Sequence, residues 1–86
     1  MELSKTDLTT GEELPGARLQ LTDENGAVVE EWTSTKEPHI IKELVVGKSY
    51  TLTETKPADG YATAESITFT VENTVEIQKQ VMEDDV

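Results

Sequence analysis

Short segments in which apolar and polar residues alternate run through most of this 86-residue chain, and they constrain the fold more than any other feature. Alternation with a period of two places one face of an extended strand against a core and the other face in solvent. The β-branched residues Thr, Val and Ile, which favour strands, supply 25 of the 86 residues. No segment shows a helical period over a useful length. The sequence therefore predicts an all-β protein.

Turn residues divide the chain into about seven segments of this kind. The expected strands cover residues 2–7, 17–21, 27–33, 39–44, 48–54, 67–71 and 75 onward. Asn25-Gly26 predicts a tight hairpin turn in which both residues have positive φ. In the last segment the apolar phase changes between Ile77 and Met82, which one bulge would explain. Short strands separated by turns at this spacing predict an antiparallel β-sandwich, formed as a single domain over residues 1–86.

The size of the chain limits how stable such a sandwich can be. A domain this small buries only about 60% of the surface of its unfolded chain, so its core is thin. The sequence has no cysteine and a single histidine, His39, which excludes disulfides and thiolate metal clusters and leaves little for a zinc site. Any covalent reinforcement must come from other chemistry.

Charge and motifs exclude several classes of function. Seven basic and eighteen acidic residues give a formal net charge of −11, which repels nucleic acids and anionic lipid surfaces. No apolar run approaches the roughly 20 residues of a membrane span, and no leader peptide is evident, so we expect a soluble chain that could still be a piece of an exported protein. The sequence also lacks a Gly-rich phosphate loop, a nucleophile elbow and a metal-spaced histidine pair, and we do not expect an enzyme.

Two weaker signals have ordinary explanations. The stretch from Asp7 to Gly11 faintly resembles a calcium loop, but its ligand spacing is incomplete and a solvated turn is favoured. Trp32 and His39 could form a carbohydrate platform, but one packed aromatic residue and one surface histidine are favoured. The sequence therefore predicts neither a cofactor nor a metal site.

Two charged residues interrupt the apolar faces of otherwise regular strands. Lys5 shares a face with Leu3, and Glu54 shares one with Tyr50 and Leu52. Buried charges are costly unless they are paired or neutralised, so contact between Lys5 and Glu54 is expected. From the pattern alone, a simple buried salt bridge, or an edge position from which both groups reach solvent, remains open.

Five segments, residues 3–7, 14–17, 47–55, 57–61 and 67–71, together resemble a known family. The Lys-Thr-Asp opening and the pattern Tyr-x-Leu-x-Glu-x-x-Pro-x-x-Gly-Tyr at residues 50–61 are specific in combination. They are similar to the collagen-adhesin B-type (CnaB, or SpaA-like) repeat of Gram-positive surface proteins and pilins. The resemblance covers nearly the whole chain and implies an immunoglobulin-like sandwich.

The resemblance also implies an isopeptide bond between a lysine of the first strand and an Asn or Asp of the last strand, assisted by a glutamate. Lys5 matches the nucleophile and Glu54 the assisting carboxyl. The ending Val81-Met82-Glu83-Asp84 is similar to that of aspartate-using members, which makes Asp84 the expected partner. Asn73, in an expected turn, and Asp85, whose side chain would point to the opposite face, are the alternatives.

Elementary chemistry explains why such a trio would react. Burial favours the neutral amine of a lysine and the protonated form of an acid, and a glutamate between them can transfer the proton. A folded core that holds the groups together supplies effective molarities that can reach about 10⁵ to 10⁸ M. The reaction would release one water with Asp84, or ammonia with an asparagine. By analogy with a disulfide of similar loop length, the bond would stabilise the fold by about 4 to 5 kcal/mol.

These observations predict a non-enzymatic structural module. We expect one repeat of a Gram-positive adhesin or pilus stalk, extracellular and attached to the cell wall, monomeric, and joined to neighbouring tandem domains. The alternative is a module that binds a host glycan or protein through exposed loops such as residues 36–39. An enzyme with turnover is the least favoured interpretation because no second catalytic constellation is present.

Overall fold

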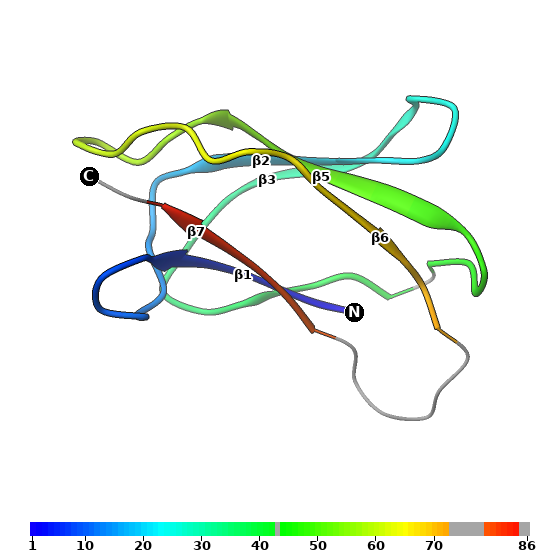
Figure 1. Ribbon diagram of the computed structural model, residues 1–86, viewed down its shortest axis with the longest axis horizontal. Coiled ribbons are helices and arrows are strands. Elements are labelled where there is room, and N and C mark those ends of the chain that lie inside the picture. Colours follow the sequence, from blue (N-terminus) through cyan, green and yellow to red (C-terminus); the bar gives the residue numbers. More distant parts are fainter. Residues whose placement is uncertain (43, 73–78, 85–86) are drawn as a thin grey trace.

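The computed structural model describes residues 1–42, 44–72 and 79–84, and these residues form seven strands in two sheets (Figure 1). One sheet has the strand order β4-β1-β7 and the other has the order β3-β2-β5-β6. The strands are β1 (Glu2–Asp7), β2 (Arg18–Thr22), β3 (Val28–Thr33), β4 (His39–Ile40), β5 (Ser49–Lys56), β6 (Ile67–Thr70) and β7 (Lys79–Asp84).

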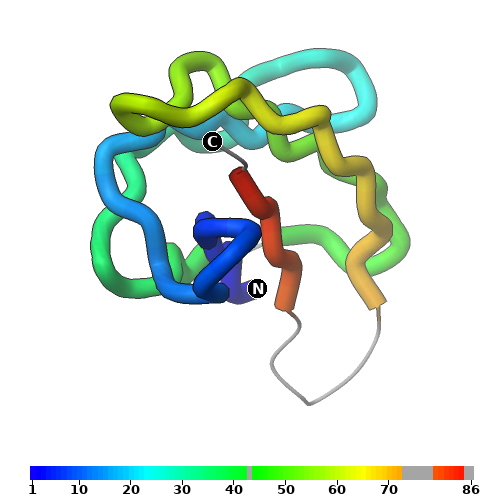
Figure 2. Tube along the Cα trace, turned by 60° about the vertical axis from the view of Figure 1, so that its left-hand side comes forward, coloured from blue at the N-terminus to red at the C-terminus, as the bar shows by residue number. Residues whose placement is uncertain are grey.

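The two sheets face each other and enclose the core. Figure 1 shows β2, β3 and β5 in the upper layer and β1 and β7 in the lower layer, and Figure 2 shows the chain wrapping around the space between them. The buried apolar side chains come from both sheets and from the segments that follow β4 and β6: Leu3, Leu19, Leu21, Trp32, Ile41, Tyr50, Leu52, Phe69, Val71 and Met82. The predicted β-sandwich is confirmed. Among the described residues, no helix is long and apolar enough to cross a membrane.

The alternation of the sequence matches the observed burial. In β5, Tyr50, Leu52 and Glu54 are buried, while the residues between them are partly exposed. In β7, Met82 and Asp84 point inward, whereas Val81 is 50% exposed. The inward phase of this strand is therefore that of Met82 and Asp84. Residues 73–78, where the sequence placed the start of the last strand, lie outside the described part of the chain. Within the interval from Ile77 to Met82, where the sequence placed a bulge, residues 79–82 pair with β1 without a register shift.

One strand pair departs from the purely antiparallel sandwich predicted above. The first and last strands, β1 and β7, pair in parallel, with Lys5 opposite Met82 and Asp7 opposite Asp84. The other described strand pairs are antiparallel. Local alternation predicts which residues face inward, but it does not predict the relative direction of strands that are far apart in sequence. The parallel pair brings the ends of β1 and β7 to the same end of the molecule.

The hairpin between β2 and β3 forms where predicted, but its turn differs from the predicted one. The Gly26 N–H donates to the Asp23 carbonyl at 3.1 Å, so the central residues are Glu24 and Asn25, and Gly26 follows with φ 82°. The Asp23 carboxylate accepts hydrogen bonds from the backbone N–H groups of Asn25 and Ala27. These side-chain hydrogen bonds favour the longer turn over a two-residue turn at Asn25-Gly26.

The fourth strand is shorter than the predicted segment 39–44. Only His39 and Ile40 belong to β4, opposite Leu3 and Glu2 of β1. Beyond them, Ile41 and Met1 exchange two backbone hydrogen bonds of 3.0 and 3.1 Å. The side chain of Ile41 turns into the core, and the regular ladder ends there.

Candidate functional site

The three residues singled out in the sequence meet inside the sandwich. Lys5 lies on β1, Asp84 at the end of β7, and Glu54 near the end of β5 in the opposite sheet. Their side chains are 1%, 0% and 0% exposed. The alternation of each strand turns these residues inward, and the parallel β1–β7 pair brings Lys5 and Asp84 to the same end. We call Lys5, Glu54 and Asp84 the buried triad.

The amine of Lys5 is the centre of the triad. Its Nζ is in direct contact with Asp84 Oδ1 and lies 3.4 Å from Glu54 Oε2. A third contact, of 3.5 Å, reaches the Met82 carbonyl. The structure therefore excludes the edge arrangement in which both charged groups reach solvent. A buried salt bridge and a reactive cluster are both compatible with these contacts.

Glu54 is oriented by a backbone group. The Ala64 N–H donates to Glu54 Oε1 at 2.7 Å, which leaves Oε2 on the side of the Lys5 amine. Burial raises the pKa of Glu54 above its ordinary value of 4.5, and the adjacent Asp84 carboxyl raises it further. The Ala64 N–H and the Lys5 amine oppose this shift and lower the pKa. Because burial dominates, Glu54 holds a proton more tightly than an exposed glutamate does.

The two carboxyl groups have few partners apart from the amine. Within the described part of the chain, Glu54 Oε2 and both Asp84 oxygens are buried and have no hydrogen-bond partner of good geometry. Leaving buried carboxyl oxygens without such partners costs free energy. The buried triad is therefore costly as a salt bridge, and its amine touches a carboxyl. Both features make it a candidate reactive site rather than a purely stabilising one.

Asn73 and Asp85 both lie outside the described residues.

The segment after β1 is a turn organised by Asp7. Its Oδ1 accepts hydrogen bonds from the N–H groups of Thr9 at 2.7 Å and Thr10 at 3.2 Å, and its Oδ2 accepts one from the Tyr61 hydroxyl. Both carboxylate oxygens are thus used within the protein. Among the described residues, no group of three or more potential metal ligands gathers here or elsewhere. The hydrogen bonds of Asp7 form a turn at the place where the sequence favoured one.

Trp32 and His39 stack on each other between the sheets. Their ring centroids are 4.2 Å apart at an interplanar angle of 10°, and Trp32 is only 9% exposed. His39 Nε2 also contacts the Glu30 carboxylate. Because His39 covers one face of a nearly buried indole, these two residues do not offer a platform for a sugar ring. The packed aromatic residue predicted from the sequence is confirmed, while His39 is half-buried rather than fully at the surface.

Two contributions to the site had no signal in the sequence. The Ala64 N–H that holds Glu54 is a backbone group, and no residue type marks it. The Tyr61 hydroxyl bonds to Asp7 across 54 positions. Tyr61 belongs to the Gly-Tyr end of the pattern noted above, but the sequence assigned it no role.

The fold and the buried triad define a class of protein, a small β-sandwich module with an amine–carboxyl cluster between its first and last strands. The sequence profile of one family, described as the SpaA prealbumin-like fold domain, matches residues 1–85. The chain belongs to this family of SpaA-like domains. No curated protein gives a significant match.

Solved structures with the same fold belong to longer proteins. The Bacillus anthracis TIE protein is 30% identical, with a TM-score of 0.79, and the match covers 98% of this chain and 16% of that one. The group B streptococcus pilus 2b backbone protein is 20% identical, with a TM-score of 0.76 and coverages of 98% and 39%. The shaft pilin SpaA of Lactobacillus rhamnosus GG is 19% identical, with a TM-score of 0.71 and coverages of 98% and 44%. The two pilins share the fold, and the chain spans less than half of each of these three proteins.

Proposed function

We propose that this chain is a structural module of a Gram-positive cell-surface protein, a pilin or an adhesin, and that it crosslinks itself through an isopeptide bond between Lys5 and Asp84. The observation that carries the proposal is the contact between the Lys5 amine and the Asp84 carboxyl in the interior, with Glu54 beside them. The family of the chain and the pilins among its structural neighbours support the proposed setting.

The proposed reaction is the condensation of an amine with a carboxylic acid. The neutral Lys5 Nζ attacks Asp84 Cγ, and Glu54 accepts the proton that the amine loses. Glu54 then returns a proton to the Asp84 hydroxyl, which leaves as water while the new amide bond remains. Each molecule reacts once, and no oxidant, cofactor or external group is consumed. The folded core supplies the proximity that makes this condensation possible in water.

The position of the proposed bond, between the first and last strands, would make the module stable and resistant to force. A link between β1 and β7 closes a loop of about 80 residues, and loops of this length gain about 4 to 5 kcal/mol in the chain-entropy account of crosslinks. A force applied to the two ends of the module would load a covalent bond rather than strand hydrogen bonds. This property suits a stalk domain placed outside the cell between tandem neighbours, which are the partners we propose.

Intact-mass measurement of the purified chain tests the proposal. The chain should weigh one water molecule less than its sequence, and Lys5→Ala and Asp84→Ala should each have the full mass of their sequences. Peptide mapping should recover a branched peptide that joins residue 5 to residue 84. Lys36→Ala, which removes an exposed lysine, is the matched control and should still lose water. A wild-type chain of full mass would refute the crosslink.

A further inference from the structure

The segment that joins β5 to β6, residues 57–66, lies over the triad end of the sandwich. It begins with a turn in which the Tyr61 N–H donates to the Ala58 carbonyl at 3.0 Å, and the side chain of Ala58 is buried. It then supplies the Ala64 N–H that holds Glu54. Figure 1 shows this segment beside the ends of β5 and β7. We call residues 57–66 the covering segment.

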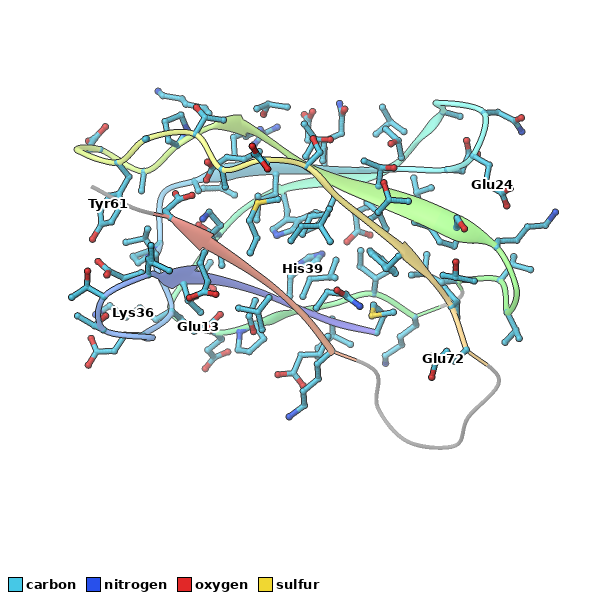
Figure 3. All side chains as sticks on the ribbon, in the orientation of Figure 1. Glu13, Glu24, Lys36, His39, Tyr61 and Glu72 are labelled. Atoms are coloured by element: carbon cyan, nitrogen blue, oxygen red, sulfur yellow. The ribbon has the colours of Figure 1, made fainter. Side chains whose placement is uncertain are left out.

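Tyr61 connects the covering segment to the opposite sheet. Its hydroxyl donates to Oδ2 of Asp7, the last residue of β1. Figure 3 shows the Tyr61 side chain extending from the upper layer toward the turn that follows β1. Asp7 is paired in register with Asp84, and the Leu8 N–H donates to the Asp84 carbonyl at 2.8 Å. The hydrogen bond between Tyr61 and Asp7 therefore ties the covering segment to the β1–β7 pair, which carries Lys5 and Asp84.

The acceptor of this bond, Asp7, is also held by two backbone N–H groups. The Tyr61 hydroxyl lowers the pKa of Asp7, and the backbone N–H groups of Thr9 and Thr10 lower it further. The same contact raises the pKa of Tyr61. The pair is thus a phenol donor and a carboxylate acceptor over a wide pH range, and hydrogen bonds to an ionised acceptor are among the stronger ones in proteins.

We propose that Tyr61 is a positioning residue for crosslinking: through Asp7 it holds the two sheets together over the buried triad. The inference rests on the proposed function. The triad is divided between the sheets, with Lys5 and Asp84 in one and Glu54 in the other. The contact between Lys5 Nζ and Glu54 Oε2, at 3.4 Å, crosses the gap between the sheets, so a small separation of the sheets weakens proton transfer first. The same separation admits water to the triad.

The rate of crosslinking in Tyr61→Phe tests this role. The full-length chain, synthesised and kept unfolded in denaturant, is diluted into buffer, and the loss of one water is followed by intact mass. A displacement of about 1 Å at a reacting site can cost about 100-fold in rate, so we expect the rate constant to fall by about ten- to a hundredfold. The variant should still lose one water molecule in the end, because the triad itself is intact.

Tyr50→Phe is the matched control. It also removes one phenol hydroxyl, which accepts the Val45 N–H at 3.0 Å, and Tyr50 lies four residues before Glu54 on β5, roughly 13 Å away. Tyr50→Phe should crosslink at the wild-type rate, since a general loss of stability by itself does not displace the triad.

A pH profile separates positioning from a purely structural effect. If Tyr61→Phe admits water, it relieves the burial that is the main cause of the raised pKa of Glu54. In a plot of the crosslinking rate constant against pH, one inflection reports the ionisation of Glu54. This inflection should move to lower pH in Tyr61→Phe and stay in place in Tyr50→Phe. Lys5 and Asp84, the titratable groups that face Glu54, are unchanged in both variants.

Asp7→Asn keeps the proposal testable if Tyr61→Phe folds poorly. An asparagine can still accept the Thr9 and Thr10 N–H groups through its oxygen. Its amide nitrogen cannot accept the Tyr61 hydroxyl and can only donate to the phenol oxygen, so a weaker neutral hydrogen bond replaces the bond to a carboxylate. Asp7→Asn should slow crosslinking by no more than Tyr61→Phe does, and the double variant should be no slower than Tyr61→Phe alone.

The outcomes distinguish this inference from the proposed function. A wild-type chain that never loses water overturns the crosslink itself. A wild-type chain that crosslinks, together with folded Tyr61→Phe and Asp7→Asn chains that match its rate and pH profile, overturns the role of Tyr61 alone. Additive losses in the double variant also overturn it, because they would mean that the two residues act independently.

Discussion

Lys5 on β1 lies directly opposite Met82 on β7, and the two strands run in the same direction. Because the period of a strand is two, Asp84 shares the inward face with Met82, one inward position further along. The Lys5 amine touches the carboxyl of Asp84 and lies within 3.5 Å of the Met82 carbonyl. This register gives a buried amine a buried acid as its neighbour.

Replacing Glu54 by glutamine should slow the crosslink without preventing folding. Glutamine still offers an oxygen to the Ala64 N–H, but it cannot act as the proton acceptor. General acid–base catalysis contributes about 10²- to 10⁴-fold, and the rate of water loss measured by intact mass should fall by that factor. Glu65→Gln makes the same change at an exposed position and should react normally. Equal rates for both variants would exclude the assigned role of Glu54.

The crosslinked chain should be much more stable than an uncrosslinked chain of nearly the same shape. Glu54→Gln that has not yet reacted provides this comparison. Its free energy of unfolding, from denaturant titration, should be lower than that of the wild type by about 4 to 5 kcal/mol, the value expected for closing a loop of this length. A difference below about 1 kcal/mol would mean that the bond does not constrain the unfolded chain.

A variant without the Lys5 amine should be more stable at acidic pH than at neutral pH. In Lys5→Met, Glu54 keeps the two causes that raise its pKa, burial and the Asp84 carboxyl. An acid with a raised folded-state pKa contributes stability that is fully present below its unfolded pKa, near 4.5, and is lost as the pH rises through the folded-state pKa. Urea midpoints measured upward from pH 4 should therefore fall.

The double variant Lys5→Met, Glu54→Gln isolates this contribution. Asp7 and Glu31 have lowered pKa values, so their contributions are lost as the pH falls, and both variants share them. Only the single variant should show the additional decrease above pH 4.5. Parallel profiles for the two variants would contradict the prediction.

The stack of Trp32 on His39 should contribute to holding the sheets together. It joins β3 to β4, which belong to different sheets. His39→Ala should lower the free energy of unfolding by about 0.5 to 1.5 kcal/mol, the usual value of such an aromatic pair, whereas His39→Phe should retain most of it. Both are measured in the Glu54→Gln background so that the crosslink does not mask the effect. A loss of the same size from Lys36→Ala, at an exposed position, would show that the stack is not the cause.

Much of the fold could be predicted because strand burial is a local property. The alternation around Leu52 gave the inward face of β5, including the carboxylate of Glu54, and the structure agrees. Boundaries were less predictable where tertiary contacts decide them. The turn near Asn25 is lengthened by the Asp23 side chain, and β4 ends where Ile41 turns into the core.

The sequence alone determined that Lys5, Glu54 and Asp84 belong to strands and that the first two face inward. Alternation with a period of two depends only on residues close together in the sequence. The resemblance to a family indicated which acid to consider. Only the tertiary structure decided that β1 and β7 run parallel, that Ala64 orients Glu54, and that Tyr61 reaches Asp7. These contacts join residues distant in sequence, and their geometry depends on how two sheets come together, which no local pattern encodes.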